Sequence, residues 1–222
     1  KPLDKYYNVG TGQIFDWSFT HPSGYIELSK NLGFFNIRTT PAWNTVERTK
    51  GTIRVEPSSN GYENMKMFIE NGFNVSILNA GYGNKYYSSM PADTNRIDMY
   101  PPTEREHIDA FANYTASLPS ILKTQDGKTL NADRLEIWNE PNLYTYWGYV
   151  EGSKPDPLQY VYLVNRAAAK IRKQNPDIII SGGALAAGNM NDYTDHKNYL
   201  NIMYDLGMLK YVDEYSFHPY MY

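Results

Sequence analysis

The hydrophobic and polar positions of the chain fall into two kinds of segment that alternate along its length. Short apolar runs, typical of buried strands, are bounded by polar or glycine-rich residues. Between them lie longer segments with apolar residues three and four positions apart, the spacing of an amphipathic helix. The predicted strands cover residues 7–15, 34–39, 74–79, 133–139, 177–181 and 212–218, and the predicted helices cover residues 23–32, 62–71, 103–122, 156–175 and 199–209. Thr103 and Glu106 have the spacing of a capping box at the start of the third helix.

This alternation predicts a parallel sheet with helices outside it. Two architectures have this order, an open doubly wound sheet and a (β/α)8 TIM barrel. No GxGxxG turn follows the first strand and no GxxxxGK[ST] motif occurs, which disfavours a nucleotide-binding open sheet. Polar residues instead cluster where strands end, which is where barrel enzymes place their active sites. These residues are Arg38, Asn79, Asn139, Glu140 and His218.

The length of the chain predicts one domain. A full TIM barrel takes about 250 residues, and the 222 residues of this chain supply six strands of the eight. We therefore expect residues 1–222 to form a single α/β catalytic domain that holds about the first six βα units of a (β/α)8 barrel and is incomplete at its C-terminal side.

Composition narrows the partners and cofactors. The net charge of −3 leaves no basic excess for binding nucleic acid, and no apolar run is long enough to span a membrane. Cysteine is absent, which excludes disulfides and thiolate metal sites. The four histidines share no HxH or HExxH spacing. We expect no metal and no cofactor, and a secreted or periplasmic location.

The segment LEIWNEPN, residues 135–142, carries the candidate chemistry. Pro141 cannot donate a hydrogen bond to a strand ladder, so the fourth strand must end there with Glu140 at its C-terminal rim. Strict alternation would send Asn139 and Glu140 to opposite faces, so a bulge or a turn must bring them to one site. Beside Trp138 the carboxyl group would be desolvated and its pKa raised, as a general acid near neutral pH requires.

Three motifs, in order on successive predicted elements, resemble those of the clan A retaining glycoside hydrolases. IWNEPN at 137–142 resembles their acid/base signature, FNIRTTPAWNTVERTKG at 35–51 their second-strand segment, and YSFHPY at 215–220 their sixth-strand end. The third strand ends in LNAGYG, residues 78–83, and lacks the histidine of the endoglucanase and mannanase branch. The layout is most similar to family 39, which includes β-xylosidases and α-L-iduronidases.

The resemblance implies a role for each matching residue. Glu140 corresponds to the general acid/base, and Asn139 to the residue that hydrogen-bonds the sugar 2-hydroxyl. Arg38 corresponds to the arginine whose charge keeps the nucleophile ionised. Tyr220 corresponds to the tyrosine that hydrogen-bonds the nucleophile, and His218 to a subsite histidine.

The nucleophile itself is expected outside these residues. A retaining glycosidase needs two carboxylates about 5 to 5.5 Å apart, and in the clan the second is a glutamate that ends the seventh strand. We therefore expect the protein to continue beyond Tyr222, with the remainder of the same protein completing the barrel and supplying that glutamate. The implied activity is cleavage of a β-linked glycan with retention, and hence polysaccharide degradation.

Aromatic residues predict where the glycan binds. The chain holds 21 tyrosines and 4 tryptophans, and flat rings with a polar tip suit sugars, which are apolar on one face and hydroxylated at their edges. Those on the predicted loops at the catalytic end are candidates to stack on an oligo- or polysaccharide substrate. The candidates are Trp43, Tyr82, Tyr144 and Trp147.

Two other functions remain open from the sequence. A non-catalytic carbohydrate-binding protein on a degenerate TIM barrel would carry the same aromatic residues but lack the seventh-strand glutamate. A barrel enzyme acting on phosphorylated metabolites would need a glycine-rich phosphate loop after strands seven or eight. Arg38, the Asn139-Glu140 pair and the segment from His218 to Tyr220 disfavour the second of these.

Overall fold

A computed structural model of the chain describes residues 10–11, 22–55, 60–89, 99–122, 132–148, 154–187 and 195–219. These residues form one six-stranded sheet in which all neighbouring strands are parallel and the spatial order follows the sequence. The strands are β1 (Gly10–Thr11), β2 (Asn36–Thr39), β3 (Asn74–Ala80), β4 (Arg134–Ile137), β5 (Ile179–Ala186) and β6 (Glu214–His218). A doubly wound sheet would reverse its strand order partway, so the sequential order selects the barrel.

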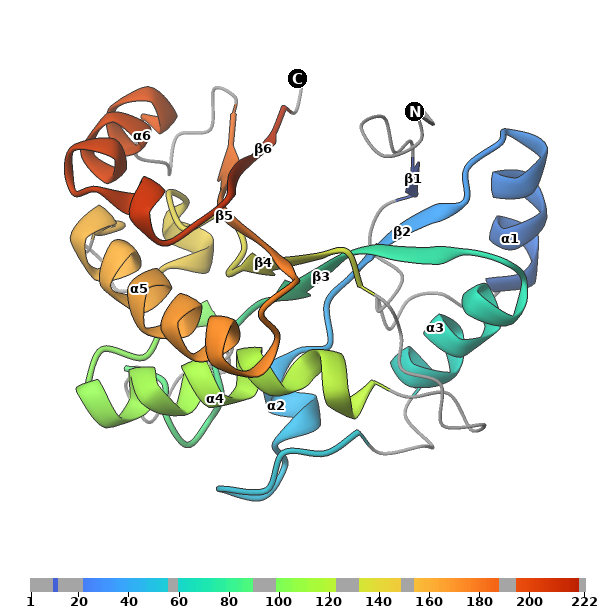
Figure 1. Cartoon of the computed structure of the whole chain (residues 1–222), viewed down its shortest axis with the longest axis horizontal. Helices are drawn as coiled ribbons and strands as arrows, with labels where there is room; N and C mark the ends of the chain where they lie inside the picture. The colour runs from blue at the N-terminus through green and yellow to red at the C-terminus, as the bar shows by residue number, and fades with distance from the viewer. Residues whose placement is uncertain are drawn as a thin grey trace.

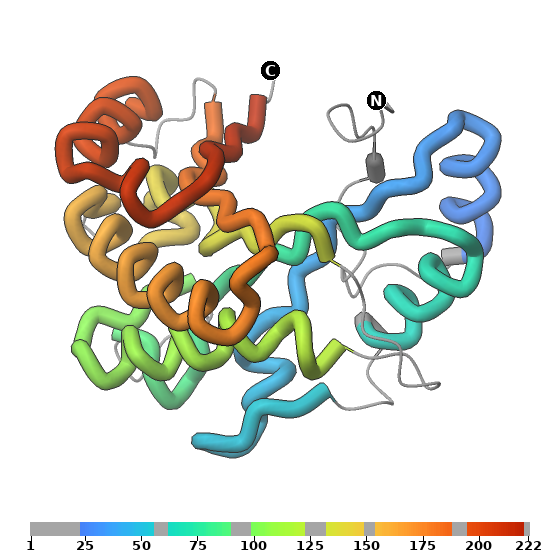
Figure 2. Tube along the Cα trace, in the orientation of Figure 1, coloured from blue at the N-terminus to red at the C-terminus, as the bar shows by residue number. Residues whose placement is uncertain are grey.

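Helices cover the outside of this sheet. They are α1 (Pro22–Asn31), α2 (Trp43–Val46), α3 (Asn60–Glu70), α4 (Arg105–Ile121), α5 (Pro157–Gln174) and α6 (His196–Asp205), with short 3₁₀ helices η3 (Tyr144–Tyr146) and η4 (Met208–Lys210). In Figure 1 the strands run through the middle, with α4, α5 and α6 on one side and α1 and α3 on the other. The tube in Figure 2 follows the same arc. β1 and β6 are the two ends of the strand order, so they do not pair with each other. The fold is a curled half-barrel, a partial TIM barrel.

The helix boundaries follow local chemistry, and one predicted cap is wrong. Asp156 precedes α5 and its side chain accepts from the backbone N–H groups of Leu158 and Gln159, which satisfies two donors of the first turn. The capping box expected at Thr103 does not form. The N-cap of α4 is Glu104, and it makes no side-chain capping bond.

The fifth strand is longer than the sequence indicates. We expected it to end at Ser181, before two glycines, but β5 continues through both of them to Ala186. A side-chain carbon at Gly182 would collide with the side chains of Met208 and Val212. Glycine is therefore required here because the segment that leads into β6 packs directly against the strand.

Aromatic rings form a continuous layer between the strands and helices α4 and α5. Trp43, Phe111, Trp138, Trp147 and Tyr160 follow one another in contact, with ring centroids 5.3 to 5.6 Å apart. Each of these side chains is buried. The layer lies beneath the C-terminal end of β4 and gives the residues that follow this strand a rigid base.

Candidate active site

The backbone turns sharply after β4 and carries Asn139 and Glu140. Ile137 is the last residue of the strand, and Trp138 and Glu140 then adopt left-handed backbone conformations, with φ of +67° and +47°. Such values are unfavourable for residues with a Cβ atom. The distortion that the sequence required here is confirmed, because the chain leaves the alternating pattern before Asn139. Both Asn139 and Glu140 are buried, with exposed fractions of 4% and 5%.

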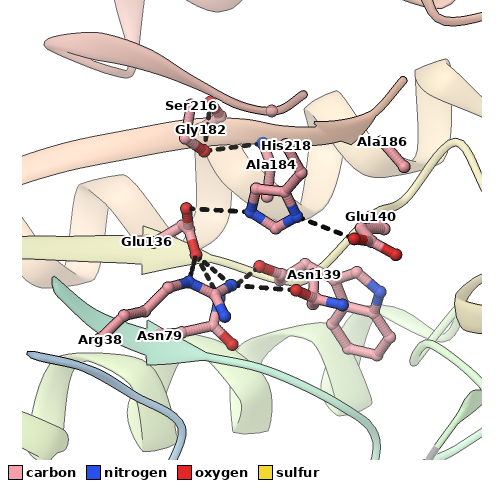
Figure 3. Close-up of polar contacts among 12 residues, drawn as sticks. Arg38, Asn79, Glu136, Asn139, Glu140, Gly182, Ala184, Ala186, Ser216 and His218 are labelled. Atoms are coloured by element: carbon pink, nitrogen blue, oxygen red, sulfur yellow. Dashed lines mark hydrogen bonds and ion pairs between the residues drawn. The ribbon is translucent and has the colours of Figure 1, made fainter. Parts of the chain in front are cut away.

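An arginine on β2 and a glutamate on β4 form a largely buried ion pair under this turn (Figure 3). The Arg38 guanidinium donates through Nε and Nη2 to Oε2 of Glu136, at 2.8 and 2.5 Å. Nη2 also donates to Oδ1 of Asn139 at 2.9 Å. Arg38 therefore connects the strand interior to the turn, and it fixes which way the Asn139 amide faces.

Asn79 ties β3 to the same cluster. Its Nδ2 amide donates to Oε2 of Glu136 at 2.9 Å and to the backbone carbonyl of Trp138 at 2.6 Å. Its Oδ1 accepts from the Thr40 hydroxyl at 3.1 Å. A side-chain carbon at Gly81 would lie 2.5 Å from this same Oδ1, so only glycine lets the chain leave β3 so close to Asn79.

The charge of Glu136 is stabilised by its partners. Burial alone would raise the pKa of this carboxyl, but the imidazole of His218 and the guanidinium of Arg38 outweigh burial and lower the pKa to about 2. Glu136 is 1% exposed. A buried carboxylate with this many donors is an ionised structural anchor at any physiological pH.

The imidazole of His218, at the end of β6, lies between two carboxylates (Figure 3). Its Nδ1 is 2.9 Å from Oε1 of Glu140 and its Nε2 is 3.8 Å from Oε1 of Glu136. Burial would lower the pKa of His218, but the contacts with the two glutamates raise it overall. The ring therefore links Glu140 to the buried carboxylate of Glu136 from β6, two strands away from β4.

Four of the predicted site residues come together, from three separate strands. Arg38, Asn139, Glu140 and His218 are connected through hydrogen bonds and through Glu136, which contacts both Arg38 and His218. Tyr220 lies outside the described residues. Glu140 contacts the His218 ring, which in turn contacts the Glu136 partner of Arg38, so the Glu140 carboxyl and the Arg38 guanidinium lie on the same side of the sheet.

The four predicted stacking residues divide into two kinds. Tyr82 and Tyr144 are partly exposed, and the Tyr82 ring lies 5.9 Å from the ring of Tyr146 across the loops after β3 and β4. Trp43 and Trp147 are fully or nearly fully buried, at 0% and 4% exposure. Their expected stacking on substrate is corrected, because neither ring presents a face to solvent in this structure.

Trp43 anchors the loop after β2 instead of binding substrate. Its ring is stacked between Tyr87 and Tyr114, with centroids at 4.9 and 5.4 Å. Its Nε1 donates to the buried carboxylate of Glu47 at 2.6 Å, and that carboxylate also accepts from the backbone N–H of Gly51 at 2.7 Å. In the Trp-x-x-x-Glu-x-x-x-Gly pattern at 43–51, the first and last residues thus both donate to the carboxylate of the central glutamate, which holds the loop closed.

Tyr87 brings the loop after β3 to the same carboxylate. Its hydroxyl donates to Oε1 of Glu47 at 2.6 Å. Burial is the main cause and the hydrogen bond to Glu47 the second cause that raise the pKa of Tyr87 to about 12. The hydroxyl therefore keeps its proton and remains a donor. Asn84 adds two further bonds, from its amide to the carbonyls of Trp43 and Glu47. The loops after β2 and β3 are therefore fastened together beside the site.

Replacing Glu47 with glutamine will destabilise the fold by about 1–3 kcal/mol, because one carboxylate oxygen becomes an amide that faces donors and leaves them unsatisfied. Urea unfolding of the Glu47→Gln variant measures this loss. Glu63, exposed on α3, offers the matched control, since Glu63→Gln makes the same chemical change in solvent. Equal stability of the two variants would contradict the anchoring role.

Sequence reasoning did not select Glu136. The signal was a charged residue flanked by the apolar Leu135 and Ile137 in β4, together with an arginine directly after Ile37 in β2. A charge buried in a sheet needs an opposite charge on a neighbouring element. Applied to these two strands, that rule leads to the pair of Glu136 and Arg38 that the structure shows.

Within the described ranges no group of three or more His, Cys, Asp or Glu residues could hold a metal ion. Over the same part of the chain, no helix combines the length and apolar character needed to cross a membrane.

No family model and no curated protein matches the chain. Solved structures do. A family 39 glycoside hydrolase from the gut symbiont Bacteroides cellulosilyticus WH2 is similar over 95% of this chain and 38% of its own, with a TM-score of 0.66 and 25% identity. A monomeric β-xylosidase from Caulobacter crescentus CB15 is similar over 99% and 43%, with a TM-score of 0.61 and 19% identity.

The structural similarity is not limited to family 39 enzymes. An endo-1,4-β-mannanase from Rhizomucor miehei is similar over 96% of this chain and 67% of its own, with a TM-score of 0.62 and 17% identity. The fold is therefore that of the clan A glycoside hydrolases and is similar to family 39. The chain spans about two fifths of the length of the first two of these proteins.

Proposed function

We propose that this chain carries the acid/base half of a retaining glycoside hydrolase that cleaves a β-linked glycan. The observation that supports the proposal most strongly is the position of Glu140. Its carboxyl group is buried at the C-terminal rim of the sheet, directly after Asn139 and in contact with His218. A barrel places its reacting groups at this rim, and a general acid needs a partly desolvated carboxyl there.

In the first step the protonated Glu140 carboxyl donates its proton to the glycosidic oxygen. The bond between this oxygen and the anomeric carbon breaks as a second carboxylate attacks that carbon from the opposite face. In the second step the Glu140 carboxylate takes a proton from water, and the water oxygen displaces the enzyme carboxylate. The proton given in one step is thus recovered in the next, and the sugar leaves with its original configuration.

Asn139 binds the sugar beside the breaking bond. Arg38 donates to Oδ1 of Asn139, which leaves the Nδ2 amide to donate to the sugar 2-hydroxyl. A hydrogen bond to this hydroxyl strengthens as the anomeric carbon gains positive charge. The orientation that Arg38 imposes therefore favours the transition state over the bound substrate.

The second carboxylate is a glutamate on a seventh strand outside residues 1–222. Glu136 does not fit this role, although it lies near Glu140. Its Oε2 accepts from Arg38 and Asn79 and its side chain is 1% exposed. A nucleophile must reach the anomeric carbon, and these contacts keep Glu136 beneath the surface.

Partly exposed tyrosines supply the substrate contacts. Tyr82 and Tyr146 face each other with ring centroids 5.9 Å apart, and Tyr144 lies on the same η3 turn. Rings at this position can stack on pyranose faces next to the site. The charge on these loops is low, which favours a neutral glycan over one rich in uronate.

The test uses the complete protein that contains residues 1–222. It is incubated with a panel of nitrophenyl β-glycosides, and the anomer first formed is followed by proton NMR. We expect hydrolysis of at least one β-glycoside, with the β-anomer appearing first. Initial formation of the α-anomer would contradict the retaining mechanism. Saturable glycan binding without hydrolysis would instead support the carbohydrate-binding alternative.

A further inference from the structure

The backbone ladder between β4 and β5 stops before it reaches the site. The last paired residues are Glu136 and Ser181, yet β5 continues to Ala186 while the chain after β4 turns away. Beyond this point the peptide groups of the two segments need other hydrogen-bond partners, because buried backbone groups are rarely left unpaired. Two buried side chains supply hydrogen bonds to these backbone groups. One acts on the chain before Glu140 and the other lies after it.

Tyr160, on α5, supplies the first connection. Its hydroxyl donates to the carbonyl oxygen of Ile137 at 2.8 Å and accepts from the backbone N–H of Gly183 at 2.8 Å. Burial raises the pKa of Tyr160, so the hydroxyl keeps its proton and can serve both bonds. The side chain is 0% exposed. One hydroxyl thus bridges β4 and β5 where their own ladder has ended.

Asn142 supplies the second connection, two residues after Glu140. Its Oδ1 accepts from the backbone N–H of Ala186 at 3.0 Å, and its Nδ2 donates to the carbonyl of the same residue at 3.0 Å. The side-chain amide therefore pairs with Ala186 as a neighbouring strand would. Between the two side chains, the N–H of Glu140 donates to the carbonyl of Ala184 at 3.0 Å.

The segment between these connections is strained. Trp138, Glu140 and Ala184 all have positive φ, at +67°, +47° and +45°, and none of them is glycine. Residues persist in such conformations only where their surroundings enforce them. Tyr160 acts just before the strained turn and Asn142 just after it, so they are placed to enforce it from both ends.

We propose that Tyr160 and Asn142 are positioning residues that together hold the strained turn and fix the Glu140 carboxyl at the C-terminal rim of the sheet. Neither touches substrate, and both act through the backbone. The catalytic part of this inference rests on the proposed function, whereas the structural part, the fixing of the Glu140 backbone, can be tested without it.

The first measurement is amide hydrogen exchange, followed by NMR. Tyr160→Phe keeps the ring packing and removes only the bridging hydroxyl. We expect exchange at Gly183 and Glu140 to quicken about tenfold or more, because a local opening exposes these amides without global unfolding. The control is Tyr114→Phe, since Tyr114 is equally buried and its hydroxyl donates to the carbonyl of Pro41, away from the turn. The control should leave Glu140 at its original rate.

The second measurement uses the complete protein. Tyr160→Phe should lower kcat for glycosides with poor leaving groups about tenfold or more, because small misplacements of a reacting group are costly. KM and the rate for activated aryl glycosides should change little. Tyr114→Phe should match the loss of thermal stability without this selective loss. Asn142→Ala is the second variant, used if Tyr160→Phe folds poorly. It should quicken exchange at Ala186 and Glu140 and cause the same selective loss of kcat.

Unchanged exchange at Glu140 in both variants would overturn the inference. So would quickened exchange together with unchanged kcat on poor leaving groups, since the turn would then be loosened without consequence for Glu140. If the unaltered complete protein hydrolyses no glycoside, the proposed function fails. The exchange rates alone then decide whether these side chains fix the turn.

Discussion

Replacing Glu140 with alanine will lower kcat/KM for glycans and other substrates with poor leaving groups by about 10²- to 10⁴-fold, the usual contribution of a general acid. The physical reason is that an alkoxide leaving group must be protonated as the glycosidic bond breaks. Activated aryl glycosides need little protonation, because their phenolate leaves unaided. The first step on these substrates should therefore keep most of its rate, as a pre-steady-state burst of nitrophenol would record.

The matched control for this variant is Glu214→Ala. Glu214 begins β6, at the opposite end of the strand from the site, and it pairs with Arg134 at the start of β4. Removing it deletes the same side chain from the same sheet without touching the site. Equal losses on activated and unactivated substrates in Glu140→Ala would argue against the acid/base role, even if activity as a whole disappeared.

Replacing Glu136 with glutamine will destabilise the fold by about 3–5 kcal/mol near neutral pH, because it leaves the charge of Arg38 without its partner. Two hydrogen bonds from the guanidinium and one from Asn79 end on the carboxylate that is lost. Chemical unfolding of the complete protein that contains residues 1–222 measures this directly. Glu214→Gln is the control, since its ion pair with Arg134 is partly exposed and such pairs contribute at most about 1 kcal/mol.

The same substitution will also change how stability depends on pH. The pKa of Glu136 is about 2 in the folded protein, against 4.5 for an unperturbed carboxyl. Its contribution is therefore present above pH 4.5 and is lost as the pH falls toward 2, an effect of about 3 kcal/mol. His218, whose pKa is raised, stays protonated over this range and adds no slope. Retention of the full acid dependence in Glu136→Gln would contradict the assignment.

The order of elements could be predicted from the sequence because burial and periodicity determine it locally. Apolar runs identified all six strands, and glycine identified helix ends such as Gly33 and Gly72, both with positive φ. The end of β5 could not be predicted, since glycines usually interrupt strands. Here the reason for Gly182 is the side chain of Met208, which approaches from 26 residues further along the chain.

The residues of the site that lie in recognisable sequence motifs could be predicted, and the residues outside such motifs could not. Arg38, Asn139, Glu140 and His218 lie in short patterns with a recognisable chemistry. The burial of Trp43 was not predictable, because an aromatic residue on a loop can turn toward solvent or toward the core, and the choice depends on distant partners such as Tyr114. Tyr160 likewise lies in an ordinary helical pattern. Its hydroxyl reaches the end of β4 only because Tyr160 is in the first turn of α5, and the sequence pattern does not show this.

The ion pair between Arg38 and Glu136 has a consequence for how the site responds to its medium. The charge of the Arg38 guanidinium is already balanced by the Glu136 carboxylate, whose Oε2 lies 2.8 Å from Nε of Arg38. Both groups are largely shielded from water. Mobile ions screen exposed charges over about a Debye length but hardly reach buried ones. The polar contacts inside the site should therefore change little when the salt concentration of the medium rises.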